Sequence, residues 1–318
     1  MIEQQSGDNQ SEFEQTLVNK IATEAITEQR RARRWSVFFK LFMVIYISAV
    51  TLVYLVDGWD GASLGGEKHT ALVDISGVIS AESQANADYI VSGLRAAFED
   101  ENTAGIILRI NSHGGSPVQA GYVNNEIYRI REEYPDMPFY SVITDMCASG
   151  GYYIAAAADK IYADKASVVG SIGVIMSGFG FVDTIEKLGV ERRLLHAGEN
   201  KGFLDPFSPL KTDEVDHVET LLTDIHQQFV DVVKKGRGDK LVNDDKIFSG
   251  LIWTGEQSIE LGLVDALGSP GYVAREVIGA EEIVDFTKRE TVLDQFASQI
   301  GATFARSISS ILAGFEIR

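Results

Sequence analysis

The stretch GIILRINSHGGSPVQAGYVNNEIYRIREEYPDMPFYSVITDMCASGGYYIAAAADKIYAD, residues 105–164, carries the pattern from which the fold can be predicted. Short apolar runs alternate in it with longer stretches of helical character, and the alternation begins before it. The predicted strands are 71–80, 105–110, 138–144 and 160–164. The predicted helices are 86–100, 117–134, 150–159 and, further along, 210–235. Strands that alternate with helices of this length imply βαβ crossovers, so the sequence predicts an α/β fold.

A glycine-rich turn, INSHGGSP (residues 110–117), follows the predicted strand at 105–110. A strand that runs into paired glycines and then into a helix exposes backbone N–H groups at the helix N-terminus. Such groups suit a developing negative charge, whether a phosphate or an oxyanion. Because turns of this kind are common in α/β proteins, this one alone does not identify a function.

A second turn of the same kind, MCASGGYY (residues 146–153), follows the strand at 138–144. The small residues around Ser149 let its hydroxyl project at the mouth of the turn, beside the N–H of Gly150. That is the geometry of a nucleophile elbow, although the G-x-S-x-G spelling is absent. The alternative is a serine that caps the following helix. Cys147 fits a small packing residue better than a second nucleophile.

An uncharged apolar run, LFMVIYISAVTLVYLV (residues 41–56), precedes the α/β pattern. A helix of about 20 residues spans a bilayer core, so we expect a transmembrane anchor over 35–57. Four arginines within residues 30–34 flank one side, and acidic residues flank the other. The positive-inside rule then places residues 1–34 in the cytoplasm and the rest of the chain outside it. A cleaved signal peptide is the alternative, but no convincing small-x-small cleavage site follows the long run.

The composition argues against several classes of function. The formal net charge of −18 over 318 residues argues against a nucleic-acid partner, because phosphate binding needs clustered Lys and Arg. The single cysteine, Cys147, cannot form an intramolecular disulfide. The five histidines share no metal-ligand spacing, and neither CxxC nor HExxH occurs. We therefore expect no metal and no cofactor.

The two turns together are more specific than either alone. NSxGG followed by ASGGYY on successive βα units resembles the ClpP/crotonase-type fold, with its repeated ββα units. More narrowly, the chain resembles the signal peptide peptidase A family of bacterial membrane proteases, in its short form. The resemblance covers roughly residues 70–275 and continues through VVGSIGVI (168–175), GENKGFLDPFSPL (198–210) and GLIWTGEQSIELGLVDALG (250–268).

The resemblance implies a catalytic pair at two positions, Ser149 as nucleophile and Lys201 as general base. The chemistry of lysine agrees, provided that Lys201 is buried. An ordinary lysine has a pKa near 10.4 and is a poor base at neutral pH, but burial among apolar groups lowers that pKa. A neutral amine could then accept the Ser149 proton during attack on a peptide carbonyl. Glycine, phenylalanine and proline residues around Lys201 favour such surroundings.

Backbone N–H groups of Gly114 or Gly115 and of Gly150 are the expected oxyanion hole. Ser171 is a candidate for a hydroxyl that holds the Lys201 amine, and a turn-capping serine is the alternative. One departure from the family pattern is His113, where many relatives have proline. A histidine base at this position is disfavoured, because a residue in the oxyanion turn would have difficulty reaching the nucleophile as a base does.

The expected organisation of the chain combines the apolar run with the resemblance. The segments are a cytoplasmic tail 1–34, the anchor 35–57, a Gly-rich linker 58–68, a protease domain 69–290 and a C-terminal amphipathic helix 291–318. Within the protease domain, Thr254 and Gln257 predict a capping box, and Gly262 predicts the end of the helix that it starts.

The function implied is that of a membrane-anchored serine endopeptidase that degrades apolar peptides, such as cleaved signal peptides, on the periplasmic side of the cell membrane. The family also implies a homo-oligomeric ring, with peptides and the lipid bilayer as partners. A related alternative is proteolysis of misfolded membrane-proximal proteins. Acyl-CoA chemistry is another alternative, disfavoured by the absence of a basic cluster for the CoA phosphates. The last is a non-catalytic scaffold, in which Ser149 and Lys201 would be dispensable.

Overall fold

The computed structural model describes residues 27–31, 33–52 and 66–289. The chain divides into two compact units, Met1–Gly65 and Gly66–Arg318, which we describe separately.

The described part of the first unit holds one helix, Thr27–Leu52, that is long and apolar enough to cross a membrane. It has 26 residues and a mean hydropathy of 1.8, and it contains most of the predicted anchor 35–57. Most of the predicted tail 1–34 and of the linker 58–68, and the whole helix 291–318, lie outside the described residues.

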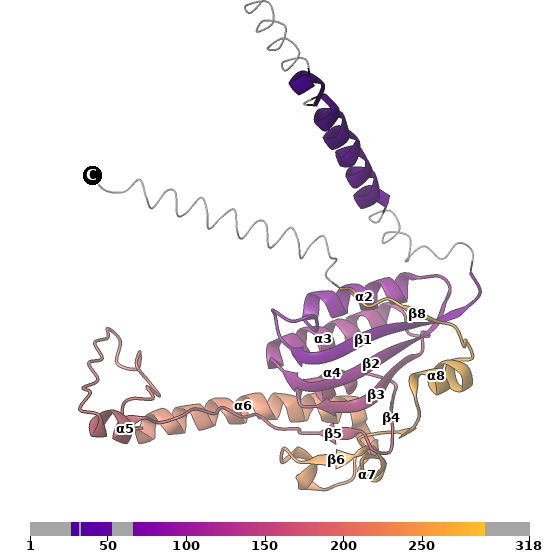
Figure 1. Ribbon diagram of the computed structural model, residues 1–318. Coiled ribbons are helices and arrows are strands. Elements are labelled where there is room, and N and C mark those ends of the chain that lie inside the picture. Colours follow the sequence, from indigo (N-terminus) through magenta and orange to yellow (C-terminus); the bar gives the residue numbers. More distant parts are fainter. Residues whose placement is uncertain (1–26, 32, 53–65, 290–318) are drawn as a thin grey trace, which may run out of the picture. The chain divides into compact units, whose positions relative to one another are not determined.

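The second unit is built on an eight-stranded sheet, which confirms the predicted α/β class (Figure 1). The strands are β1 His69–Ile79, β2 Thr103–Gly115, β3 Phe139–Ala148, β4 Lys160–Ala163, β5 Val168–Gly170, β6 Ile252–Thr254, β7 Ala266–Leu267 and β8 Ile283–Asp285. The order is β6-β5-β3-β2-β1-β8, and every pairing is parallel except that of β6 with β5. β3 has two partners along one side. Its first half pairs with β4, which in turn pairs with β7, and its second half pairs with β5.

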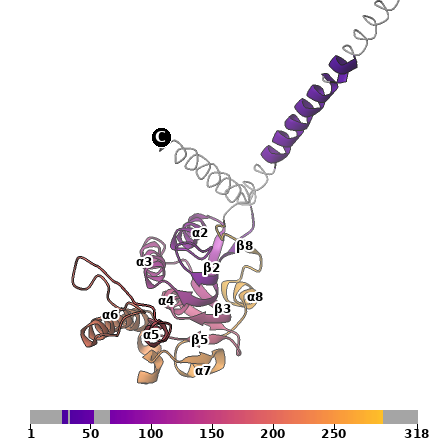
Figure 2. The same cartoon turned by 60° about the vertical axis from the view of Figure 1, so that its left-hand side comes forward.

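Helices cover both faces of this sheet, which explains why its central strands are almost continuously apolar. The helical elements are α2 Ala87–Glu99, α3 Pro117–Glu133, α4 Gly150–Ala155, α5 Val182–Lys187, α6 Thr212–Arg237, η1 Gly238–Lys240, η2 Asp245–Phe248, α7 Gly255–Glu260, α8 Pro270–Tyr272 and η3 Val273–Ile278. Side chains of α2, α3, α4 and the second half of α6 form the larger core with one face. Val273 and Ala274 of η3 pack with strand residues on the other face. Figure 2 shows α2, α3 and α4 on one side of the sheet and α8, which directly precedes η3, on the other.

Local capping signals explain where several helices begin and end. The side chains of Asn86 and Ser116 accept hydrogen bonds from the first turns of α2 and α3. The predicted capping box of Thr254 and Gln257 is present on α7, and Gly262 follows that helix with φ +75°. These three helix starts agree with the sequence prediction.

The helix predicted over 150–159 is shorter than expected, because α4 ends at Ala155. The end of α6 lies against Ala156, the residue that follows α4. A Cβ added to Gly236 would come within 1.9 Å of the Ala156 carbonyl oxygen. The chain then turns, and the Asp159 N–H donates to the Phe139 carbonyl at 3.0 Å, just before β4. The strand predicted over 105–110 is longer than expected and runs through the paired glycines to Gly115.

Residues 173–211, here called the arm, leave the sheet after β5 and lead back to it through α6. Figure 1 shows α5 and its connecting loop at the N-terminal end of α6, with the sheet beside the other end. The exposed apolar side chains of the arm include Ile175, Phe179, Leu188, Val190, Leu195 and Leu210. Exposed apolar side chains in this number on one segment make the arm a candidate for an interaction surface.

Candidate active site

Ser149 stands at the junction of β3 and α4 in a backbone conformation that non-glycine residues rarely adopt, with φ 50° and ψ −122°. Its N–H donates to the Gly170 carbonyl at 2.9 Å, and its carbonyl accepts from the Tyr153 N–H at 3.0 Å. Strain of this sort persists only where the surroundings enforce it, and it concentrates at functional sites. Although Ser149 occupies the N-cap position of α4, its side chain makes no capping hydrogen bond within the described residues. The geometry therefore favours the nucleophile elbow over the capping alternative.

The paired glycines of β2 lie directly against this turn. A Cβ added to Gly114, which has φ +98°, would come within 2.7 Å of the Ser149 Cβ and of the Gly150 nitrogen. The Gly114 N–H already donates to the Ser112 hydroxyl at 3.0 Å. Gly115 and Gly150 both line the same pocket as Ser149. Because Gly150 is the first residue of α4, its N–H has no acceptor within the helix, so Gly150 and the neighbouring Gly115 are better placed than Gly114 as candidates for the oxyanion hole.

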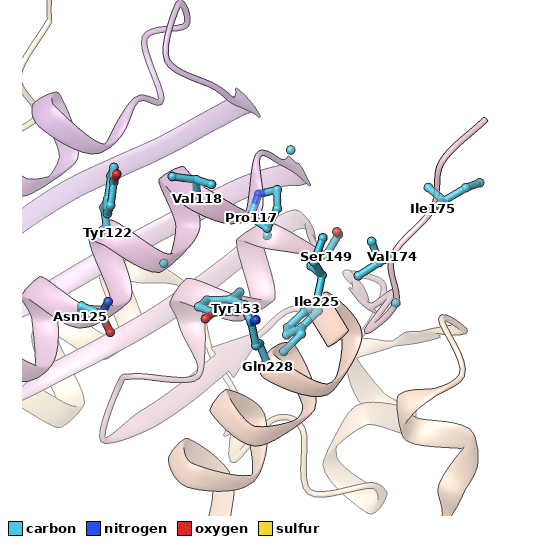
Figure 3. A pocket seen from close by; sticks show the side chains of 15 residues that line it. Pro117, Val118, Tyr122, Asn125, Ser149, Tyr153, Val174, Ile175, Ile225 and Gln228 are labelled. Atoms are coloured by element: carbon cyan, nitrogen blue, oxygen red, sulfur yellow. The ribbon is translucent and has the colours of Figure 1, made fainter. Parts of the chain in front are cut away.

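Ser149 opens onto a pocket of about 450 Å³ between α3, α4, the start of the arm and α6 (Figure 3). Most of the lining is apolar or aromatic: the labelled side chains include Pro117, Val118, Tyr122, Tyr153, Val174, Ile175 and Ile225. Asn125 and Gln228 add polar groups to its wall. These lining residues were not predicted from the sequence. Spacing along α3 could have suggested Val118 and Tyr122, but no sequence signal shows that α6 reaches the pocket.

Lys201 lies elsewhere in the chain, in a turn of the arm where its N–H donates to the Gly198 carbonyl at 3.1 Å. Its side chain is exposed and is not among the residues that line the Ser149 pocket. Its neighbour Phe203 borders a cavity with His217, in the second turn of α6, whereas Ile225 reaches the Ser149 pocket. Eight residues of helix correspond to about 12 Å along the axis. The structure thus does not bring Lys201 into the Ser149 pocket within one chain, and the apolar surroundings expected for Lys201 are not formed by the chain alone.

The remaining candidates are placed by strand register and burial. Ser171 follows Gly170, which pairs with Ala148, so Ser171 comes next to Ser149 along the sheet and shares its positive φ of 50°. His113 is exposed, between two buried residues of β2, and it does not line the Ser149 pocket. Cys147 is fully buried, and burial raises the pKa of its thiol, which fits a packing role. Within the described residues, no three His, Cys, Asp or Glu side chains are grouped as metal ligands.

A strained serine at a strand–helix junction, beside glycine N–H groups and above an apolar pocket, is an arrangement that nucleophilic acyl-transfer sites share. Residues 132–282 match the family "Peptidase family S49". The chain belongs to this peptidase family and resembles its signal peptide peptidase A-type members.

Individual relatives match this chain over different lengths. A putative signal peptide peptidase SppA of Enterococcus faecium is 31% identical over 242 residues, 74% of this chain and 66% of that protein. A putative protease of Synechocystis sp. is 30% identical over 202 residues, 64% of this chain and 70% of that protein. A protein of Brucella abortus named Na(+)/H(+) antiporter NhaA is 43% identical over 186 residues, 58% of this chain. The match covers only a quarter (25%) of that last protein's length.

Proposed function

We propose that this protein is a serine endopeptidase in which Ser149 is the nucleophile and Lys201 the general base. The observation that carries the proposal is the geometry of Ser149: its backbone has φ 50°, its hydroxyl does not cap α4, and the residue lines a largely apolar pocket. Membership of a peptidase family supports the reaction class.

In the proposed reaction, the Ser149 Oγ attacks the carbonyl carbon of a peptide while neutral Lys201 takes the hydroxyl proton. The carbonyl oxygen becomes an oxyanion that the N–H groups of Gly115 and Gly150 stabilise, with the backbone of Gly114 holding the turn. Lys201 then returns the proton to the departing amine, and the C–N bond breaks to leave an acyl-enzyme. Water, deprotonated by the Lys201 amine, then attacks the acyl carbon. The Lys201 amine gives this proton to the Ser149 Oγ as the ester bond breaks, which releases the second product and restores Ser149.

Lys201 is proposed to act on the Ser149 of a neighbouring copy. Two observations support this arrangement: Lys201 is exposed and absent from its own chain's Ser149 pocket, and the arm that carries it has many exposed apolar side chains. Packing of the arm on a second copy would bury those side chains and dehydrate the Lys201 amine, which lowers a lysine pKa. Head-to-tail contacts of this type close into a ring, the oligomer that we propose. Ser171, beside Ser149, is then available to hold the incoming amine.

The proposed substrates are short apolar peptides, cleaved signal peptides among them. The apolar and aromatic lining of the pocket supports this class, as does the name of the Enterococcus faecium relative. The helix Thr27–Leu52 would anchor the enzyme in the cell membrane with residues 1–34 in the cytoplasm and the catalytic unit on the periplasmic side, where such peptides leave the bilayer.

The test uses the full-length protein in detergent with fluorogenic apolar peptides. We expect Ser149→Ala and Lys201→Ala each to lower kcat by at least about 10⁴-fold, as for other members of a catalytic unit. Lys187→Ala, which removes another exposed lysine of the arm, is the matched control and should leave kcat unchanged. Substantial turnover by Lys201→Ala would rule out lysine as the base. Turnover by Ser149→Ala would rule out the elbow serine as the nucleophile.

A further inference from the structure

Residues 193–204, here called the lysine loop, carry Lys201 and are closed at their base by an ion pair. The guanidinium of Arg192 contacts the Asp205 carboxylate twice, Nε to Oδ2 at 3.2 Å and Nη2 to Oδ1 at 3.3 Å. The Ser208 hydroxyl donates to Oδ2 of the same carboxylate at 2.8 Å. The side chain of Asp205 is only 9% exposed, and Arg192 also lies over the ring of Phe207. Two-point contacts of this kind fix orientation as well as distance.

A second hold lies at the last residue of the loop. Leu204 has φ +54°, a left-handed conformation that is unfavourable for leucine. Its N–H donates to Oε2 of Glu214 at 3.0 Å, and Oε1 of the same carboxylate accepts from Lys211 Nζ at 2.9 Å. Glu214 is buried, 7% exposed, in the first turn of α6. The Glu214 carboxylate thus holds a strained backbone three residues after Lys201. This contact does not serve the packing of the hydrophobic core, because the lysine loop lies outside the core.

We infer that Glu214 is a positioning residue for Lys201. It fixes the C-terminal end of the lysine loop on α6, while the Arg192–Asp205 pair closes the base of the loop. The opposite end of α6 is packed into the sheet core, so this attachment gives an otherwise exposed lysine a defined place relative to the body of its own chain. The inference rests on the proposed function, since it assigns a role in the placement of the proposed base.

The charge state of the two carboxylates agrees with this role. The Leu204 N–H, together with Lys211, lowers the pKa of Glu214, and hydrogen bonds from Arg192 and Ser208 lower the pKa of Asp205. A carboxyl whose pKa is lowered by its folded partners stays ionised at neutral pH, and these contacts are lost only as the pH falls through the lowered value. Both holds therefore persist throughout the pH range in which a lysine base would work.

The experiment compares Glu214→Ala and Glu214→Gln with Asp216→Ala, all in the full-length protein. Asp216 is an exposed carboxylate on the same helix and serves as the matched control. We expect Glu214→Ala to lower kcat by roughly 30- to 100-fold with KM changed less than about threefold, because small misplacements of a reacting group have effects of this size. Glu214→Gln keeps an oxygen that can accept from Leu204, so it should retain several-fold more turnover than Glu214→Ala.

The pH profile separates positioning from a general loss of folded protein. Loss of folded protein lowers kcat/KM equally at every pH. A loosened lysine loop leaves the amine more hydrated, so the rising limb of the profile should also move to higher pH in Glu214→Ala. Leu204→Gly is a second variant, since glycine adopts φ +54° freely and the loop becomes looser while Glu214 is retained. It should show the same displacement of the limb to a smaller extent.

The outcomes distinguish this inference from the proposed function. If Lys201→Ala is inactive but Glu214→Ala and Leu204→Gly have the wild-type limb and kcat, the inference is wrong and the Ser–Lys proposal stands. If Glu214→Ala does not fold, Glu214→Met, which fills the same space without an acceptor for the Leu204 N–H, takes its place, and a wild-type limb and kcat in that variant overturn the inference. If Lys201→Ala remains active, the proposed function fails, and the inference fails with it.

Discussion

The Ser149 turn and the lysine loop carry the two proposed reacting groups, and they are held in different ways. Ser149 directly follows β3 and has a positive φ. The register of β3 with β5 and the close approach of the β2 glycines fix this backbone conformation. Lys201 is held from outside the sheet, through Glu214 and the Arg192–Asp205 pair. The core thus positions the proposed nucleophile, whereas contacts at one end of α6 position the proposed base. Mutations should therefore separate the two regions.

The largest effect on stability should come from the end of α6 that is fixed to the core. Arg237 is only 2% exposed. Its Nε donates to the Gly262 carbonyl and its Nη1 donates to the Asp265 carboxylate, which also pairs with Lys240. Removing one partner of a buried pair costs 3–5 kcal/mol, so Arg237→Met should lower the free energy of unfolding by about 3 kcal/mol. Chemical denaturation measures this value. Lys246→Met, at an exposed lysine, is the control.

The loss in Arg237→Met should depend on pH with a definite sign. Burial raises the pKa of Asp265, but hydrogen bonds from Arg237, Lys240 and the Ile161 N–H outweigh it and lower the pKa overall. The Asp265 contribution is thus present at neutral pH and is lost as the pH falls through the lowered value. The difference between wild type and variant should shrink in acid. A difference that stayed constant after the Asp265 carboxyl had been protonated in acid would contradict the assignment to this pair.

A slightly smaller effect, on turnover rather than stability, should follow from crowding the nucleophile turn. In Gly114→Ala the new Cβ would lie 2.7 Å from the Ser149 Cβ and from the Gly150 nitrogen, so the turn must shift. A displacement of about 1 Å can lower kcat by about 10²-fold. Gly271→Ala is the control, because no described atom lies within 4 Å of that added Cβ. Wild-type kcat in Gly114→Ala would break the view that the core sets the position of Ser149.

Relief of backbone strain should give an effect of opposite sign. We expect Ser149→Gly, which removes the hydroxyl, to abolish turnover, yet glycine accepts φ 50° without cost. Compared with Ser149→Ala, which keeps the strain, Ser149→Gly should be more stable by roughly 1 kcal/mol. Thermal unfolding of the two inactive variants measures the difference. Equal stability would mean that the left-handed conformation stores no strain.

The smallest effect should come from His113. Its side chain is exposed on β2 and does not line the Ser149 pocket. His113→Ala should therefore keep kcat within about twofold of wild type and leave the pH profile in place, since surface substitutions away from a site have small effects. Loss of turnover in this variant would favour a histidine base and weaken the case for Lys201.

The difference between the Ser149 turn and the lysine loop also explains what could be predicted from the sequence. The strand–turn–helix order around Ser149 is local, so alternation of apolar runs and paired glycines was enough to predict it. The candidates for the oxyanion hole followed from the same turns. The sequence could not show that the Gly114 N–H already donates to the Ser112 hydroxyl, because that bond depends on side-chain placement. The location of Lys201 was not predictable. The arm leaves the sheet, and the residues that hold it, Glu214 and Arg192, meet the loop only in three dimensions.

The central claim is that Ser149 of one copy works with Lys201 of another, and complementation tests it most directly. Full-length Ser149→Ala and Lys201→Ala chains, each inactive alone, are coexpressed with different tags, and mixed assemblies are purified through both tags. Sites that combine the intact serine of one variant with the intact lysine of the other should restore roughly a quarter of wild-type turnover, given random mixing in a head-to-tail ring. Mixed assemblies that form but remain inactive would contradict a shared site.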